Sequence, residues 1–504
     1  MVSTKRNAVA DPVRQRGRPK DLSCLRNKYI LLLLVMAVSF GVYSNTLSHE
    51  FVWDDQYEIL QNVWIRNLES IPNMFVSHSL AWLPTEKATM QYYPLKLVVR
   101  ILQYRLFETA PMGYHLTNVL LHVSSTAVFF LVVVSFFKHI YREKALFFPV
   151  IASLLFAIHP VHAEPVNWVS SLHELCMSLF CLLSFFVYIR APEGKKYNKV
   201  LSSLFFFIAI FFKSSALFFP LVFLGYDYCL RRGAFAPDLK GVAAFKEAIR
   251  CYVPFACSLI GYLVLFRLAV GGEAVVPKEG FIKLDIFDWA VNIPPLLMKY
   301  FELLLFPSDL NALYVFHAVT SFTSVQFLFS ALVSAGFAAV VIMAWRKNSG
   351  LFLSLLWIIV TLIPPLCLPT TGYSYYILAE RYLYLPSAGF AIAITIAVRG
   401  AYRGRILKKF TAPVVVVSAF VITTVLALLT FQRNDVWEDD YSLWSDTVQK
   451  SPDSSIAHSN LGVAYQNKRL CGEALKEYDR ALALSPSNWD AFVNRQKLLR
   501  YERQ

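Results

Sequence analysis

The sequence has little charge and no cysteine pattern that carries chemistry. Only 16% of its 504 residues are charged while 56% are hydrophobic, and the mean hydropathy is +0.48. That hydrophobic share is too high for an ordinary soluble globular protein. The eight cysteines are scattered, mostly inside apolar runs, with no Cys-x-x-Cys pair. This usage argues against both a disulfide framework and a cysteine zinc site.

The formal charge of +14 does not indicate a nucleic-acid-binding protein. Many of the lysines and arginines fall in short loops between apolar runs, where they orient membrane helices. A basic face of the kind that binds nucleic acid is not evident.

Apolar runs long enough to cross a bilayer organise the chain. A basic tail at 1–28 precedes a run at 29–47, which we interpret as a permanent helix with a cytoplasmic N-terminus; a cleavable signal peptide is the alternative, but no good cleavage site follows. Further spans are predicted at 116–137, 146–159, 168–189, 200–212, 214–230, 251–269, 325–345, 351–368, 381–398 and 411–431. The predicted fold is therefore an all-α, polytopic membrane helical bundle over 29–431, with about eleven spans.

The loops support one topology. Five basic loops fall on the N-terminal side if the segment 289–306, which contains Pro294 and Pro295, does not cross the membrane. A re-entrant or interfacial helix is predicted there. The C-terminal region then lies outside the cytoplasm.

Residues 48–112 form the first extracytoplasmic loop, with short interfacial helices expected along it. It begins with the adjacent carboxylates Asp54 and Asp55, which stand between aromatic residues suited to the lipid headgroup layer. Two neighbouring carboxylates repel each other, which raises the pKa of one of them and suits a general base.

The last part of the chain, 432–504, has the pattern of tetratricopeptide repeats. Residues 455–488 match a 34-residue unit at the expected small, aromatic and proline positions. A half repeat precedes this unit and one further helix follows it. So short an array is near the minimum for stability, so we expect it to pack on the membrane domain or on an oligomer partner.

Transfer of a sugar from a polyprenyl phosphate requires a group that takes a proton from the acceptor hydroxyl and cations that neutralise the phosphate. Both kinds of side chain must lie on one side of the membrane, at the level of the headgroups. Candidates on the extracytoplasmic side are Asp54, Asp55, His115, His159, His162, Glu164, Lys213, Glu380 and Arg381.

Each candidate also has a structural interpretation. The acidic pair could be solvated loop residues, and Lys213 could extend its amine to the interface rather than bind phosphate. Glu380 and Arg381 could pair with each other, although an arginine at a helix start suits a bidentate phosphate contact. His115 is as consistent with packing as with a pocket.

The segment His159-x-x-His162-x-Glu164 has metal-like spacing. Pro160 and Pro165 interrupt the helix that would align the ligands, and no fourth ligand is evident. A hydrogen-bonded turn that shapes a donor pocket is the favoured interpretation, so no metal or other cofactor is expected.

Several ordered motifs resemble one family, that of the transmembrane and tetratricopeptide-repeat proteins, relatives of the membrane protein O-mannosyltransferases. The motifs are Tyr43-x-Asn45, Phe51-Val-Trp-Asp54-Asp55, Gly113-Tyr-His115-Leu-x-Asn118-x-x-Leu-His122, His159-Pro-x-His162-x-Glu164-x-Val-x-Trp168, Ala379-Glu380-Arg381-Tyr382-Leu-Tyr384-Leu-Pro386-Ser387 and the terminal repeats. The resemblance covers almost the whole chain.

The resemblance implies a GT-C fold and metal-independent, inverting transfer of a mannose-like hexose from a dolichyl or undecaprenyl phosphate to a protein or glycan. It assigns catalysis to the acidic pair, with Asp54 as the base, and places Glu380 and Arg381 in the donor pocket. A protein partner bound through the repeats is a further expectation.

The chain departs from the family pattern at three places. Tyr93 stands where the family often has arginine, and Leu172 stands where it often has another arginine. Ser214 replaces a glutamate after Lys213. These departures put the usual choice of sugar or acceptor in doubt, with His173 a partial replacement. The short repeat array resembles a bacterial member, so the bacterial inner membrane is predicted, with the endoplasmic reticulum as the alternative.

Two other functions remain open. A transporter or flippase would place polar residues deep within spans and show inverted repeats, neither of which is clear. A non-catalytic membrane scaffold that presents its repeats would tolerate substitution of Asp54 and Arg381.

Overall fold

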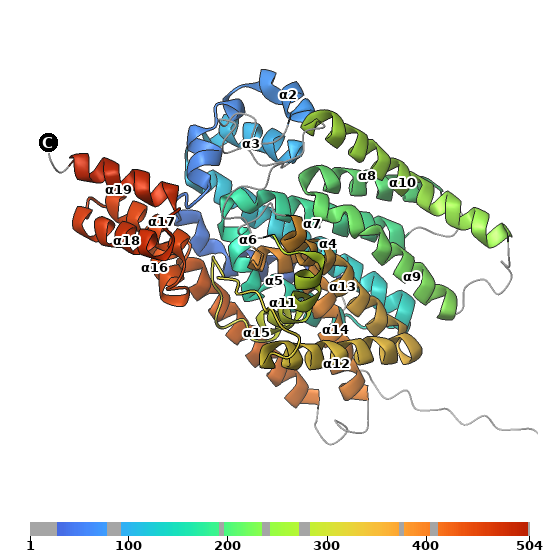
Figure 1. The fold of residues 1–504 in the computed structure, drawn as a ribbon. Helices are drawn as coiled ribbons and strands as arrows, with labels where there is room; N and C mark the ends of the chain where they lie inside the picture. The colour runs from blue at the N-terminus through green and yellow to red at the C-terminus, as the bar shows by residue number, and fades with distance from the viewer. Residues whose placement is uncertain are drawn as a thin grey trace, which may run out of the picture.

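The computed structural model describes residues 28–77, 92–190, 196–233, 242–271, 283–371, 377–403 and 412–501. Within these ranges every regular element is a helix (Figure 1). The predicted all-α class is confirmed. The basic tail lies outside the described residues except for Lys28.

The helices are α1 Lys28–Val42, α2 Ile71–Val76, α3 Pro94–Phe107, α4 Pro111–Tyr141, α5 Phe147–Ala157, α6 Ala163–Asn167, α7 Leu172–Ile189, α8 Lys196–Phe212, α9 Pro220–Gly233, α10 Val242–Val270, α11 Ile286–Leu305, α12 Val325–Lys347, α13 Ser349–Thr371, α14 Tyr384–Arg403, α15 Ala412–Asp435, α16 Asp440–Lys450, α17 Ser455–Asn467, α18 Cys471–Leu484 and α19 Trp489–Tyr501.

Long apolar helices indicate a multi-pass membrane protein. Among the described residues, 7 helical segments are long and apolar enough to cross a bilayer. They are Pro111–Tyr141, Val169–Ile189, Cys251–Val270, Val325–Lys347, Ser349–Thr371, Glu380–Arg403 and Val414–Asp435. A pair bent by 48°, Phe147–Ala157 with Pro160–Asn167, adds an eighth if it counts as one span. The predicted total of about eleven is reached only if the shorter apolar helices Lys28–Val42, Asn198–Phe212 and Ser214–Leu230 cross as well.

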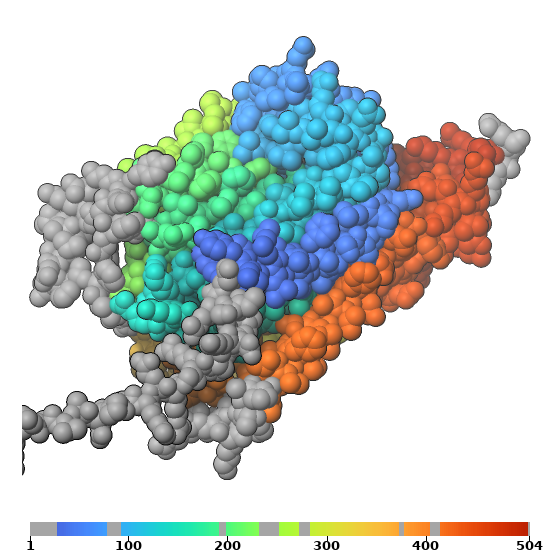
Figure 2. Space-filling view, turned by 180° about the vertical axis from the view of Figure 1, so that it is seen from behind, coloured from blue at the N-terminus to red at the C-terminus, as the bar shows by residue number. Residues whose placement is uncertain are grey.

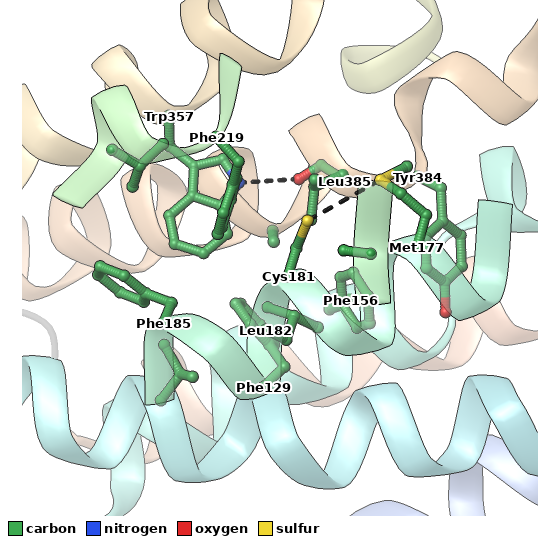
Figure 3. Close-up of a cluster of buried hydrophobic side chains, with 14 of the residues drawn as sticks. Phe129, Phe156, Met177, Cys181, Leu182, Phe185, Phe219, Trp357, Tyr384 and Leu385 are labelled. Atoms are coloured by element: carbon green, nitrogen blue, oxygen red, sulfur yellow. Dashed lines mark hydrogen bonds between the residues drawn. The ribbon is translucent and has the colours of Figure 1, made fainter. Parts of the chain in front are cut away.

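Aromatic side chains fill the centre of the bundle, between α4, α5, α7, α13 and α14 (Figure 3). The ring of Phe185 stands edge-on to the indole of Trp357, with centroids 5.1 Å apart. The indole N–H of Trp357 donates to the carbonyl of Leu385 at 3.1 Å. At Gly389 an added Cβ would lie 2.8 Å from the carbonyl oxygen of Ser354, so α13 and α14 approach closely at a small residue.

One end of the bundle gathers basic groups and the other gathers the site candidates. Arg399 and Arg403 on α14 both contact Glu143, just after α4. Beside them the hydroxyl of Tyr141 donates to Asn348 between α12 and α13, at 2.6 Å. Three of the predicted basic loops therefore meet at the same end of the bundle.

The first loop contains α2, α3 and several single turns, and 78–91 within it lies outside the described residues. The cations of α3 are turned into the protein. Lys96 pairs with Glu58 at 2.6 Å, and Arg100 donates to the carbonyl of Val169 at 2.5 Å. Because these cations are neutralised or hydrogen-bonded inside the protein, α3 packs on the bundle beside the start of α7.

The repeat helices α16–α19 lie at one end of the molecule, beyond the end of α15 (Figure 1). Figure 2 shows α1 in blue and α15 in orange running toward these repeats along the same face. The side-chain amide of Asn45, after α1, donates to Asp435 at the end of α15 at 2.7 Å. Inside the repeats, a Cβ at Gly462 would lie 2.6 Å from the ring of Tyr478, which shows how closely α17 and α18 approach.

Candidate active site

The acidic pair follows a tight turn after α1. Trp53 has φ 58°, a left-handed conformation that residues other than glycine seldom adopt. Its side chain is only 9% exposed. The expectation that this aromatic residue faces the lipid headgroups is therefore wrong, because the indole packs between other tryptophans inside the protein.

Asp55 fixes this turn to the start of α7. One carboxylate oxygen accepts the backbone N–H of Ser170 at 2.7 Å and its hydroxyl at 2.5 Å. The other oxygen accepts the N–H of Val52 at 3.2 Å. Burial raises the pKa of Asp55 to about 7, although the hydrogen bonds from Ser170 lower it. All three contacts hold the loop in place.

Asp54 has a different environment. Its side chain is partly exposed. Burial raises its pKa to about 6, and the charge of Glu58 raises it further, whereas the charges of Lys96 and Arg381 lower it. A carboxylate with a pKa near 6 is ionised at neutral pH and remains basic enough to accept a proton.

A row of stacked groups connects the turn to Arg381. The indoles of Trp53 and Trp168 stack with centroids 4.7 Å apart and planes 14° from parallel. The guanidinium carbon of Arg381 lies 5.0 Å from the centre of the Trp168 ring, a cation–π contact. Trp53 and Trp168 therefore connect the turn that carries the acidic pair to Arg381.

Glu164 orients Arg381. One carboxylate oxygen of Glu164 accepts the backbone N–H of Arg381 at 2.8 Å, and the other contacts its guanidinium. Glu164 is thus a partner of the cation.

Glu380 does not pair with Arg381. Its carboxylate accepts from the hydroxyl of Tyr314 at 3.1 Å and lies 3.4 Å from the guanidinium of Arg433. The internal Glu380–Arg381 pair considered from the sequence is wrong, because Glu380 contacts Arg433 whereas Arg381 contacts Glu164.

Lys213 and Arg381 line the same cavity, with a volume of about 250 Å³. Lys213 pairs with Glu174 of α7 and lies 5.0 Å from the centre of the Tyr382 ring. The rest of the lining is mostly apolar and comes from the turn before α9 and from α13 and α14: Leu217, Phe218, Phe219, Val360, Pro364, Pro365, Leu368, Leu385 and Pro386. Asp54 is not part of this lining but lies close enough to Arg381 for the two charges to interact.

Tyr93 also lines the cavity and stacks on His173, with ring centroids 5.2 Å apart and planes at 10°. A ring nitrogen of His173 contacts the carbonyl of Ser170 at 3.1 Å. Tyr93, at a position where arginine is usual in the family pattern, therefore forms an aromatic pair with His173 beside the cations.

The other predicted histidines have structural contacts. His159 contacts the carbonyl of Leu304 at 3.0 Å, and His162 contacts the hydroxyl of Ser387 at 2.8 Å. His115 contacts the carbonyl of Glu50 at 3.2 Å. None of the three lines the cavity. In the described part of the chain no group of three His, Cys, Asp or Glu side chains is placed to hold a metal ion.

Two residues near the site were not predicted from the sequence. Ser170 binds Asp55, and Asp440 at the start of α16 accepts the N–H of Trp53 at 2.8 Å. Their partners are 115 and 387 residues away, and no local pattern marks them.

Comparison with known proteins finds relatives that are named protein O-mannosyl-transferases. No family model matches the chain. "Protein O-mannosyl-transferase F38B6.6" of Caenorhabditis elegans is 26% identical over 493 residues, which cover 94% of this chain and 64% of that protein. Human "Protein O-mannosyl-transferase TMTC3" is 25% identical over 92% of this chain and 52% of its own length. Human "Protein O-mannosyl-transferase TMTC2" is 24% identical over 89% and 62%. The chain thus spans between about half and two thirds of these relatives. All three are animal proteins, so they lend no support to the predicted bacterial origin.

Proposed function

We propose that this protein is a membrane glycosyltransferase of the O-mannosyltransferase type. It transfers a mannose-like hexose from a polyprenyl phosphate to a protein acceptor on the extracytoplasmic side. One observation carries the proposal: the charge of Asp54, whose pKa is about 6, interacts with that of Arg381. Arg381 and Lys213 line one part of a cavity, and most of the remaining lining is apolar.

The cavity suits a lipid-linked phosphate. The guanidinium of Arg381 and the amine of Lys213 neutralise the phosphate, and arginine also matches phosphate oxygens in a bidentate manner. The side chains of α13 and α14 offer the prenyl chain an apolar wall. Glu164 and Glu174 keep the two cations oriented before the donor arrives.

The reaction needs one base and one stabilised leaving group. Ionised Asp54 removes the proton from the acceptor hydroxyl as its oxygen forms a bond to C1 of the sugar. The bond between C1 and the phosphate oxygen breaks, and the prenyl phosphate leaves with both electrons of that bond. Arg381 and Lys213 stabilise its added negative charge. A single displacement of this kind inverts the configuration at C1, and it uses no metal.

The protein acceptor and the family are proposed from the relatives, whose names describe protein O-mannosyltransferases. The motifs around Asp54 and Arg381 support the same family and its GT-C fold. Since these relatives are animal proteins, we place the chain in the endoplasmic reticulum membrane. The basic helix ends that meet at Glu143 face the cytoplasm, and Asp54 and the repeats face the lumen.

A scaffold that presents the repeats is the second candidate. It is favoured by one observation: Arg381 and Lys213 already have acidic partners, as cations do in a purely structural network. A scaffold requires neither an ionised Asp54 nor a free path from the cavity to that carboxylate.

The test is transfer by purified protein in lipid nanodiscs, with dolichyl phosphate mannose and an acceptor protein. Replacing the base with an amide in Asp54→Asn lowers kcat by about 10²- to 10⁴-fold. The control is Asp453→Asn, an exposed carboxylate in the turn before α17, which retains the wild-type rate. Equal rates for wild type and Asp54→Asn exclude Asp54 as the base. No transfer by either protein, with dolichyl phosphate glucose tested as well, favours the scaffold.

A further inference from the structure

The repeat region is joined directly to the loop that carries Asp54. The carboxylate of Asp440, the first residue of α16, accepts the backbone N–H of Trp53 at 2.8 Å. Trp444, one turn further along α16, places its indole edge-on to that of Trp53, with centroids 5.2 Å apart. The loop after the first span and the first repeat helix therefore share one buried cluster.

Trp53 needs such a contact because of its backbone. At φ 58° a residue with a Cβ is strained, and surrounding contacts must hold it there. The stack on Trp168 and the edge contact with Trp444 fix the ring, while Asp440 fixes the amide. Asp54 is the next residue, so the conformation of Trp53 determines where the Asp54 carboxylate points.

The neighbouring carboxylate has a separate task. Asp439 caps α16 by accepting the N–H of Ser442 at 2.7 Å, and it pairs with Lys468 on the repeats at 3.0 Å. Asp439 thus stabilises the start of the helix, whereas Asp440 binds the loop.

We infer that Asp440 is a positioning residue for the proposed base: through the N–H of Trp53, the first helix of the repeat region holds Asp54 in its reactive orientation. This inference rests on the proposed function. It gives Asp440, at the start of α16, a positioning role in addition to the role of the helix in presenting the repeats.

Four variants of the full-length protein test it: Asp440→Ala, Asp440→Asn, Asp440→Leu and the control Asp439→Ala. Asparagine keeps an acceptor for the N–H, and leucine removes it without leaving a void. We expect Asp440→Ala and Asp440→Leu to lower kcat by about 10- to 100-fold, as small displacements of catalytic groups do. The KM for the donor stays within about twofold, because the cavity is unchanged. Asp440→Asn and Asp439→Ala keep at least half of the wild-type kcat.

A second measurement does not depend on activity. With 5-fluorotryptophan incorporated, the ¹⁹F resonance of Trp53 is assigned by its loss in Trp53→Phe. This resonance shifts in Asp440→Ala and Asp440→Leu and keeps its wild-type position in Asp439→Ala. If Asp440→Ala does not fold, the kcat and the Trp53 resonance are measured in Asp440→Leu instead.

Either of two results overturns the inference. One is an unchanged kcat and an unchanged Trp53 resonance when the acceptor at 440 is removed. The other is an equal effect of Asp439→Ala, which would mean that loss of α16 in general is responsible. If the wild-type protein transfers no sugar, the proposed function fails, and the Trp53 resonance alone decides whether Asp440 holds the loop.

Discussion

The guanidinium of Arg381 lies over the indole of Trp168, 5.0 Å from its centre. The same indole stacks on that of Trp53, the residue before Asp54. Trp168 therefore contacts both the proposed phosphate ligand and the residue next to the proposed base. The predictions below follow from this arrangement and from the contacts around it.

Activity depends on pH through Asp54. Its pKa of about 6 lies above the ordinary value of 3.8, mainly because of burial. The base must be ionised, so the rate rises about tenfold per pH unit below pH 6 and becomes constant above it. Glu58→Gln removes a charge that raises this pKa, so the acid limb of the kcat profile moves to lower pH. A profile that keeps its midpoint in Glu58→Gln contradicts the assignment of that limb to Asp54.

The contact of Asp55 with Ser170 supports the loop. Ser170→Ala removes the hydroxyl donor to a buried carboxylate and lowers the free energy of unfolding by about 1–3 kcal/mol. The neighbouring Ser171 is also buried, and its hydroxyl has no hydrogen-bond partner in the described structure, so Ser171→Ala is the matched control with a change below about 0.5 kcal/mol. Thermal unfolding in detergent measures both. Equal losses in the two variants would refute a special role for Ser170.

The stability of the turn also depends on pH. Burial raises the pKa of Asp55 in the folded protein to about 7, above its value of 3.8 in an unfolded chain. The protonated form is thus favoured by folding, and its contribution to stability is complete below about pH 4 and is lost as the pH rises through 7. We expect the unfolding temperature of the wild type to fall between pH 5 and 8. In Asp55→Asn, which cannot titrate, this slope becomes smaller. An unchanged slope would rule out Asp55 as its source.

Arg381 and Glu164 depend on each other. Arg381→Met leaves Glu164 buried without its cation and destabilises the protein by about 3–5 kcal/mol. The double variant Arg381→Met with Glu164→Gln recovers most of the stability but still binds the donor poorly. The donor KM and the unfolding temperature separate these effects. Restored transfer in the double variant would exclude Arg381 as a phosphate ligand.

Close packing in the repeats predicts unequal effects at two glycines. A Cβ at Gly462 would lie 2.6 Å from the ring of Tyr478, so Gly462→Ala forces that ring to move and destabilises the repeats by about 1–3 kcal/mol. Gly472 near the start of α18 has nothing within 4 Å of the same position. Gly472→Ala is therefore neutral or slightly stabilising. Limited proteolysis of the repeats ranks the variants, and equal cleavage rates would contradict the prediction.

The sequence predicted what depends on local pattern. Hydrophobic length located the membrane helices, and the repeat periodicity located the close pair α17 and α18. It did not predict that the cations Lys96 and Arg100 of α3 would turn inward, because their partners Glu58 and Val169 lie elsewhere in the chain.

In the site too, the residue types could be predicted from local sequence but the partners could not. The residue types at Asp54 and Arg381 indicated a base and a cation, and their proximity was an expectation based on topology. The pairing of Arg381 with Glu164 joins residues 217 positions apart, and that of Trp53 with Asp440 joins residues 387 positions apart. Only the packing of the helices decides such partners. Similarly, the headgroup placement of Trp53 failed because an aromatic residue beside a span fits both an interface and a buried stack.

Arg433 joins the last membrane helix to two other parts of the molecule. At the end of α15 its guanidinium lies 2.8 Å from Asp446 of α16 and 3.4 Å from Glu380 before α14. These buried contacts tie the first repeat helix to the membrane domain. If the repeats hold an acceptor polypeptide, they present it at a constant height above the bilayer. Under the proposed function, the protein would then select hydroxyl groups by their distance along the acceptor from the point where the repeats bind it.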